Sequence, residues 1–288
     1  MPSNVLKVHS YPTDRGPEVN FTVCVAPLHN RFDDVRRVVE TIELDRMLGA
    51  DRFYVYNHST GSHLTEVLSG YNADGSDLVR VVPWRVPVKV YAKPPNTCVD
   101  LHYYGQVPAL QDCLYRNMFK SRYVVFADFD EVIVPRRFEH RDWMTMIEAL
   151  AATAGRAKKI GGFVFKNTFF RTDWPNDTRV AADVRVASRR ITSLLTTQRE
   201  RKIYPWKWRS KFIVRPELVV AVGIHEVAKV IDDDVGVLDV DEDDGLLHHY
   251  RDREGDPPMK NVTDRHMHRY YEEIIWRLVE RDRVRYGL

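Results

Sequence analysis

The sequence lacks a long apolar run, and no segment approaches the roughly 20 residues that a bilayer-spanning helix needs. The first 15 residues are polar and contain no apolar region of the kind found in signal peptides. We therefore expect either a cytosolic protein or one whose membrane anchor lies upstream and is absent from this chain.

An excess of charge of one sign is also missing. The 43 Lys and Arg residues nearly balance the 41 Asp and Glu residues, which leaves a net charge of +2. This balance gives no electrostatic basis for binding nucleic acid or a membrane surface. A hydrophobic content of 44% and a charged content of 29% are typical of a globular protein. A chain of 288 residues is long enough for one large α/β domain or two small ones.

Cysteine is scarce. The three cysteines, Cys24, Cys98 and Cys113, allow at most one internal disulfide. Cys24 and Cys113 lie within apolar patterns, so we expect them to be buried thiols.

Asn-x-Ser/Thr sequons are more frequent than chance predicts, which favours a secretory route. They begin at Asn20, Asn57, Asn176 and Asn261. Asn57 is an exception in this reading, because it lies in a turn that we assign to ligand binding.

Strand and helix patterns alternate through the first half of the chain. Apolar segments predict strands at residues 21–28, 53–56 and 78–86, and another that ends at residue 127; helical periodicity predicts helices at 33–49, 62–68 and 106–120. This alternation indicates an α/β protein with a largely parallel sheet.

The second half is less regular. We expect helices at 143–152 and 267–284, strands at 161–170, 212–222, 227–231 and 246–250, and an exposed acidic loop at 232–244. No linker divides the chain, so we predict a lead-in over residues 1–20 and a single domain over 21–288.

Three carboxylates, Asp128, Asp130 and Glu131, follow a buried strand at the sheet edge where open α/β proteins bind ligands. Carboxylates this close repel one another, and a divalent cation would neutralise them and bridge a diphosphate. A solvated acidic turn is the alternative.

Three further clusters are candidate binding groups. Residues 57–61 form a polar turn that would hold a nucleobase or ribose, unless it is a plain turn. A late histidine, from His248, His249 or the rival His225, would complete a metal shell, although a lone histidine is more often structural. The last cluster is a basic aromatic stretch that contains Trp206, Lys207, Trp208, Arg209 and Lys211. It would bind a diphosphate and an acceptor sugar, unless it is a solvated loop.

Several motifs, spread over residues 23–252, occur together. They are residues 38–43, 48–50, 53–59, 104–106, 112–116, 128–131, 135–136, 209–216, 223–227 and 249–251. In these motifs the chain resembles glycosyltransferase family 92, metal-dependent enzymes of the GT-A fold that include β-galactosyltransferases acting on fucose of N-glycan cores.

The resemblance implies a GT-A fold, with a nucleotide-binding half at about 21–135 and an acceptor-binding half at about 136–288. Asp128 and Asp130 would hold Mn²⁺ (or Mg²⁺) and the donor diphosphate, with His249 as a third ligand and His248 as its alternative. The remaining donor-site residues would be Asn57, His58 and Ser59 near the uridine, and Gln106, Asp112, Arg116 and Lys211 near the sugar, ribose or diphosphate.

The reaction implied by the resemblance transfers a hexose, namely galactose, from a UDP-sugar to a glycan with inversion. A carboxylate would act as the general base. We select Glu226, with Asp173 in reserve, although spacing fixes neither. Family members are typically anchored in the Golgi, so a Golgi lumen location is expected, with the anchor missing here.

Two other functions fit parts of the sequence. A haloacid-dehalogenase-type phosphatase also has an Asp-x-Asp motif after a strand, and here it would use Lys229 and Asp232-Asp233 downstream. A GT-A-like lectin or scaffold would bind nucleotide or glycan without turnover.

Overall fold

The first half of the chain forms a parallel sheet in the computed structural model, which describes residues 16–88, 100–154, 159–253 and 259–280. Strand β1 lies between β2 and β4 and is parallel to both, and β3 continues the sheet beside β2. The elements are β1 (Val19–Leu28), α1 (Val35–Met47), β2 (Arg52–Asn57), α2 (Ser62–Gly70), β3 (Val79–Pro83), α3 (Gln106–Asn117) and β4 (Ser121–Phe126). The predicted strands and helices of this half are confirmed.

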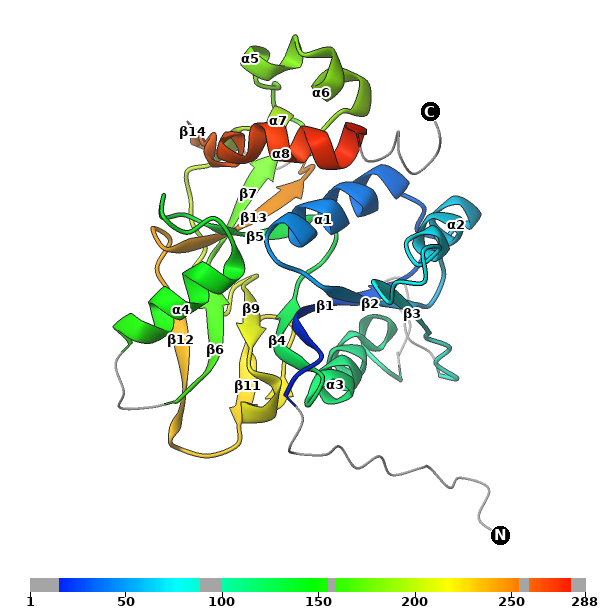
Figure 1. The fold of residues 1–288 in the computed structure, drawn as a ribbon, viewed down its shortest axis with the longest axis vertical. Helices are drawn as coiled ribbons and strands as arrows, with labels where there is room; N and C mark the ends of the chain where they lie inside the picture. The colour runs from blue at the N-terminus through cyan, green and yellow to red at the C-terminus, as the bar shows by residue number, and fades with distance from the viewer. Residues whose placement is uncertain (1–15, 89–99, 155–158, 254–258, 281–288) are drawn as a thin grey trace.

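Helices cover both faces of this sheet. Figure 1 shows α1 and α2 on one side of β1–β3 and α3 on the other. Along β1, Val23 and Val25 pack in the cluster that includes α1, whereas Cys24 packs in the cluster that includes α3. This alternation follows from the period of two in a strand. It explains why β1 is mainly apolar, since both of its faces are buried over most of its length.

The second half extends the same sheet in mixed directions. Its order is β12-β6-β9-β4-β1-β2-β3, and β9 (Lys211–Val214) runs antiparallel between β4 and β6 (Lys159–Phe165). The expected acidic loop at residues 232–244 is wrong in its middle part, because Val235–Val240 forms the edge strand β12. Valines at both ends of β12 are buried, and the acidic residues mainly occupy the flanking turns.

A second, smaller sheet has the order β14-β8-β7-β13-β5. Its strands are β5 (Glu131–Pro135), β7 (Asn167–Arg171), β8 (Gln198–Glu200), β13 (Gly245–Arg251) and β14 (Asn261–Thr263). The strand predicted at 161–170 is divided at Lys166, so that β6 and β7 belong to different sheets. The strand predicted at 212–222 is likewise divided into β9 and β10 (Val219–Val222) by a turn at Pro216, and β10 pairs with β11 (Val227–Val230).

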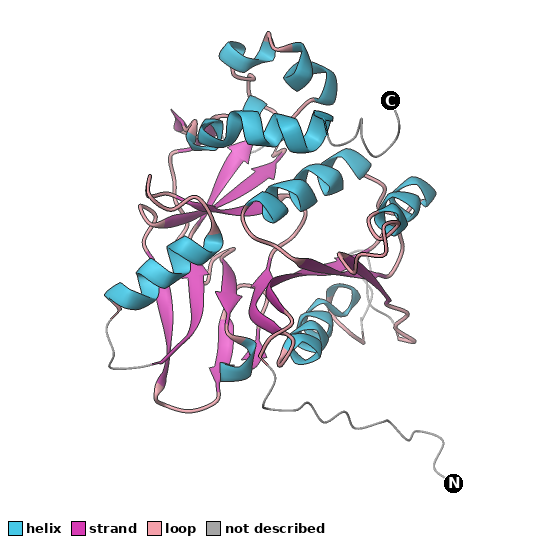
Figure 2. Ribbon diagram, in the orientation of Figure 1, coloured by secondary structure: helices cyan, strands magenta, loops and turns pink. Residues whose placement is uncertain are grey.

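Helices are packed over this second region, as Figure 2 shows. They are α4 (Trp143–Thr153), α5 (Thr178–Ala181), α6 (Val184–Arg189), α7 (Thr192–Leu195) and α8 (Tyr271–Ile275). The helical pattern at residues 178–195 is too short to predict α5–α7 from the sequence. In the structure, Asp177 is the N-cap of α5 and Asp183 is the N-cap of α6. Of the helix predicted at 267–284, the described part is a 3₁₀ turn, α8 and a wide turn to residue 280.

Cys24 and Cys113 join β1 to α3 as a disulfide with a Cα–Cα distance of 6.1 Å. Both side chains are fully buried, as expected, but the prediction of free thiols is wrong. Apolar surroundings hide the pairing in the sequence, because the two residues meet only when α3 packs on the sheet. The described ranges contain no helix that is long and apolar enough to cross a membrane.

Candidate active site

The turn between β4 and β5 presents the acidic cluster. Residues 123–126 are buried in the sheet, and the chain then turns so that the backbone N–H of Glu131 donates to the Asp128 carbonyl at 3.0 Å. The Glu131 carboxylate accepts from the Asp128 backbone N–H at 2.9 Å. The carboxylates therefore lie at the carboxyl end of a central strand, the edge at which open α/β sheets bind ligands.

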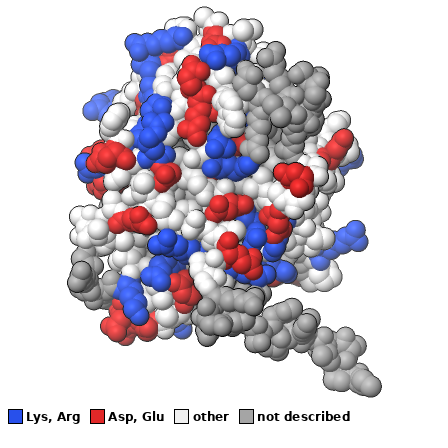
Figure 3. All heavy atoms as spheres, in the orientation of Figure 1, with Lys and Arg blue, Asp and Glu red and all other residues white. Residues whose placement is uncertain are grey.

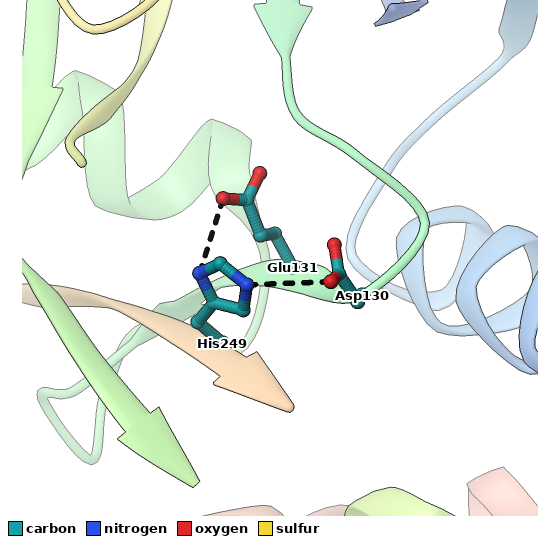
Figure 4. Close-up of side chains that lie close together, drawn as sticks. All are labelled: Asp130, Glu131 and His249. Atoms are coloured by element: carbon teal, nitrogen blue, oxygen red, sulfur yellow. Dashed lines mark ion pairs between the residues drawn. The ribbon is translucent and has the colours of Figure 1, made fainter. Parts of the chain in front are cut away.

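His249 on β13 lies between two of these carboxylates (Figure 4). Its Nε2 is 3.3 Å from Oδ2 of Asp130, and its Nδ1 is 3.3 Å from Oε1 of Glu131. Residue pairing explains the position, since His249 is the antiparallel partner of Glu131 in the second sheet. The three donor atoms are within 4.8 Å of one another, which makes a compact N/O ligand set.

His248 points to the opposite face of β13. Its ring is fully buried, stacks on Phe170 with centroids 4.2 Å apart, and lies 3.2 Å from an Arg136 nitrogen. Strand alternation predicts that only one of the two histidines can reach the carboxylates, and in the structure that histidine is His249. The rival His225 approaches the Ser210 carbonyl at 3.2 Å.

The His249 ring is the feature that fits a cation. Both of its nitrogens are buried, and neither has a hydrogen bond of good geometry among the described residues. Unsatisfied buried nitrogens are uncommon in folded proteins. A divalent ion bound by imidazole and carboxylates would satisfy the ring and the two acids together.

Lys211 supplies a fixed positive charge beside the cluster. Its Nζ is 2.8 Å from Oδ2 of Asp128 and 3.4 Å from Oε2 of Glu131, and the side chain is 3% exposed. Burial alone would lower the pKa of Lys211, but the carboxylates outweigh it and the pKa is raised. Lys211 is therefore a buried ammonium bound to Asp128, beside the predicted metal ligands.

The two carboxylates that face His249 differ in acidity. Burial raises the pKa of Glu131 to about 7. Burial would also raise the pKa of Asp130, but His249, Arg37 and Lys211 more than offset it, so this pKa lies below its usual value. Asp130 is thus the more acidic of the two, and a bound cation would favour the ionised form of Glu131.

A cavity of about 660 Å³ opens above the cluster. Its walls include the carboxyl end of β1, the Asp128–Glu131 turn, the start of α3 and the end of β13. The residues of chemical interest in its lining are His29, Arg37, Tyr103, Gln106, Asp128, Asp130, Glu131, Arg209, His225, His249 and Asp252. The volume suits a nucleotide or sugar ligand.

An unusual turn places aromatic rings at this cavity. Tyr103, Tyr104 and Gly105 all have positive φ, at 42°, 55° and 70°. His29 stacks on Tyr104 with centroids 4.0 Å apart and meets Tyr103 edge-on at 5.2 Å. Left-handed backbone is costly for non-glycine residues and is concentrated at functional sites.

Sequence reasoning missed His29, Tyr103 and Asp252. His29 had a usable signal, because it directly follows the first predicted strand and strand ends carry ligands in this architecture. Tyr103 and Asp252 had no such sequence signal, because apolar periodicity does not reveal a left-handed turn or a strand-end loop.

The predicted donor-site residues divide into two groups. Gln106 lines the cavity, but Asp112 and Arg116 lie farther along α3, where the Asp112 carboxylate accepts from Tyr56 Oη and Arg116 Nε, both at 2.6 Å. The turn at residues 57–59 is not part of the cavity lining, and its His58 ring lies 4.9 Å from the Tyr104 ring.

The predicted general bases lie outside the cavity lining. Glu226 is 3.2 Å from Lys207, and Asp173 accepts from Arg171 at 2.8 and 2.6 Å. Asp252 lies in the lining, three residues after His249. Asp252 is therefore a third candidate for the general base, in addition to Glu226 and Asp173.

A mainly parallel sheet, an Asp-x-Asp turn after its fourth strand and a late histidine facing that turn define a glycosyltransferase domain of the GT-A class. The chain belongs to glycosyltransferase family 92, whose sequence profile matches residues 19–282. The expected family and fold are confirmed.

A β-1,4-galactosyltransferase, galt-1 of Caenorhabditis elegans, is 23% identical over 238 residues. The match covers 82% of this chain and 49% of the relative, so this chain spans about half the relative's length.

Two solved structures show distant likeness. TarS of S. aureus in complex with UDP-GlcNAc has 12% identity and a TM-score of 0.40, covering 83% of this chain and 60% of that chain. Glucosyl-3-phosphoglycerate synthase from Mycobacterium tuberculosis, in complex with Mn²⁺, UDP and glucosyl-3-phosphoglycerate, has 15% identity and a TM-score of 0.35, covering 94% and 81%. At these TM-scores, neither likeness bears on the site residues.

Proposed function

We propose that this chain transfers a hexose, galactose in our assignment, from a UDP-sugar to a glycan acceptor, with Mn²⁺ (or Mg²⁺) and with inversion. The observation that carries the proposal is the position of His249 between Asp130 and Glu131 at the floor of a nucleotide-sized cavity. Family membership supports the reaction type, and the similarity to a galactosyltransferase supports the sugar.

The donor would lie along the cavity from the aromatic turn to the acidic turn. Tyr103 and His29 offer ring faces and edges for the uracil, while Gln106 offers an amide to the ribose or sugar. Asn57, His58 and Ser59 would support the aromatic turn from behind, and Asp112 and Arg116 would hold α3 against β2. Arg209 at the opposite wall would meet the diphosphate.

Asp130 and His249 would hold the cation, with Asp128 and Glu131 beside them. The bound cation would supply positive charge that stabilises the departing diphosphate. Lys211 holds Asp128 in place and offsets part of the negative charge of the turn.

In the transfer, the bond between the anomeric carbon and the β-phosphate oxygen breaks, and its electron pair leaves with UDP. The acceptor oxygen forms the new bond from the opposite face, which inverts the configuration. Its proton passes to a carboxylate base. Glu226 and Asp173 remain our sequence-based candidates, and Asp252 joins them because it lines the cavity.

The partners that we propose are UDP-galactose or another UDP-hexose and a glycan, with a fucose-bearing N-glycan core suggested by the family resemblance. The net charge of +2 and the interspersed acidic and basic residues in Figure 3 do not favour nucleic acid. We propose the Golgi lumen as the location, which the buried disulfide supports because disulfides persist in oxidising compartments.

A thermal-shift titration with UDP, GDP and CMP, each with and without Mn²⁺, tests the donor side of this proposal. A ligand at 100 times its dissociation constant adds about 2.7 kcal/mol to the free energy of unfolding. We expect stabilisation by UDP that requires Mn²⁺. Transfer is then followed with UDP-galactose, UDP-glucose and UDP-GlcNAc on a glycan panel, with the product anomer determined by NMR. UDP binding without any transfer would instead support the lectin or scaffold function.

A further inference from the structure

A second cavity, of about 600 Å³, lies between α1 and the α5–α7 region. It shares Arg37, Phe129 and Asp130 with the first cavity, so the two meet at the acidic turn. In Figure 1 the α5–α7 segment lies above α1 and the second sheet, far from the aromatic turn that begins α3. A ligand in this second cavity would thus approach Asp130 from the side away from the aromatic turn.

The second cavity is held open by a buried contact between α1 and α7. The buried Glu40 of α1 accepts from the backbone N–H groups of Thr192 and Ser193, at 3.0 and 2.7 Å. These are the first two residues of α7, where helix N–H groups lack partners within the helix. The carboxylate therefore fixes α7 against α1 and fixes the width of the cavity between them.

Two arginines in the lining of this cavity have no ion-pair partner among the described residues. Arg37 is paired with Asp34, with Nε and Oδ2 3.3 Å apart. Arg36 from α1 and Arg190 from the α6–α7 connection also line the cavity. No ion pair or side-chain hydrogen bond joins either of these two to another described residue.

Arg190 also occupies a strained position. It is the C-cap of α6 with φ at 49°, a left-handed conformation that favours glycine or asparagine. Arginine is therefore disfavoured there relative to glycine or asparagine. The side chain at this position nevertheless lines the cavity.

We propose that the second cavity binds the acceptor glycan and that Arg36 and Arg190 select a glycan with a negative charge near the accepting sugar, in place of the uncharged fucose-bearing core that the family resemblance suggests. The proposal rests on the proposed function, since it assigns the acceptor to the cavity that meets the donor cavity at Asp130. Guanidinium groups bind carboxylates and sulfates in a bidentate manner, which gives the charge selection. Asn176 and Thr172 at the rim supply uncharged groups for sugar hydroxyls.

Ligand-observed NMR with UDP and Mg²⁺ present tests the proposal on the full chain. The probes are matched pairs that differ in charge: methyl β-glucuronide with methyl β-glucoside, and a 6-sulfated galactoside with its neutral form. The variants are Arg36→Gln, which keeps a good helix former, and Arg190→Asn, which keeps a residue that tolerates positive φ. Arg189→Gln is the matched control, because Arg189 is adjacent but lies outside the cavity lining.

We expect the charged member of at least one pair to bind at least about tenfold more tightly than its neutral partner. This preference should fall to less than about threefold in Arg36→Gln and Arg190→Asn and persist in Arg189→Gln. Equal binding of charged and neutral glycosides would overturn the charge selection. No glycoside binding by a protein that binds UDP would overturn the acceptor cavity and leave the proposed donor site intact, whereas loss of UDP binding as well would contradict the proposed function itself.

Discussion

His249 Nε2 lies 3.3 Å from Asp130 Oδ2, although the two residues belong to separate parts of the chain that the pairing of β13 with β5 brings together. The imidazole has no hydrogen bond of good geometry on either nitrogen among the described residues. We therefore expect metal binding and catalysis to depend on Asp130 and His249.

Asp130→Asn should lower transfer by at least about 100-fold, because an amide binds a divalent cation more weakly than a carboxylate. The fold should be retained, since Asp130 lies in a turn at the cavity wall. Initial rates and the Mn²⁺-dependent thermal shift by UDP measure the effect. Near-normal turnover in a folded variant would contradict the metal assignment.

His249→Gln should mainly weaken metal binding, whereas His248→Gln should mainly lower stability. His249→Gln should weaken Mn²⁺ binding about 10- to 100-fold with little loss of stability. His248→Gln should retain Mn²⁺ binding but lower the free energy of unfolding by about 1–3 kcal/mol, because His248 is buried against Phe170 and Arg136. Metal titration and urea unfolding of both variants separate the roles. Equal loss of metal binding would show that the face of β13 does not decide which histidine binds.

Glu131 should make the stability of the metal-free protein depend on pH. Burial raises its pKa from 4.5 to about 7, so the folded state binds the proton more tightly than the unfolded state. Its contribution is therefore present below about pH 4.5 and is lost as the pH rises through about 7. Buried histidines with lowered pKa, such as His266, act in the opposite direction, so the comparison must be made with Glu131→Gln. In EDTA, the difference in unfolding free energy between wild type and Glu131→Gln should become less favourable to the wild type from pH 5 to 7.5; a constant difference would contradict the raised pKa.

The Cys24–Cys113 disulfide should contribute substantially to stability. It closes a loop with a sequence separation of 89 residues, for which chain entropy predicts on the order of 4 kcal/mol. Reduction, or Cys113→Ser, should lower the urea midpoint accordingly. Cys24→Ser should lower the midpoint to the same extent as Cys113→Ser, because it removes the other half of the same bond. If the reduced protein and both variants unfold at the same urea concentration as the untreated wild type, the pairing is wrong.

Among the candidate bases, Asp252 is expected to have the largest catalytic effect. Asp252→Asn should reduce kcat at least about 100-fold with UDP affinity unchanged, because general base catalysis contributes on this scale. Glu226→Gln and Asp173→Asn, whose carboxylates lie outside the cavity lining, provide the comparison. A larger loss of kcat in either of these would return the assignment to our sequence-based choice.

The sequence was sufficient for the first half of the chain because each of its elements carries its own periodicity. Apolar runs at residues 21–28 and 53–56 and the helical pattern at 33–49 correspond to β1, β2 and α1. The carboxylates of the acidic turn could be found because a strand leads directly into them. The choice between His248 and His249 as the metal ligand could be posed from the sequence, because a strand presents neighbouring residues to opposite faces.

The second half resisted prediction for physical reasons. β6 and β7 are one apolar run in the sequence, and only their partners in separate sheets divide it. β12 was hidden among acidic residues that turn out to occupy its flanking turns. The disulfide and the contact of Glu40 with α7 join residues that are distant in sequence, and no local pattern encodes such contacts.

Asn176 begins a sequon and also lies in the rim of the second cavity. An oligosaccharide attached to this residue would fill the space that we assign to the acceptor. Preparations from bacteria and from secretory eukaryotic cells would then differ in the fraction of molecules open to acceptor, even with identical sequences. The choice of expression host thus becomes an experimental variable, and intact-mass analysis of Asn176 occupancy belongs before any comparison of specific activities.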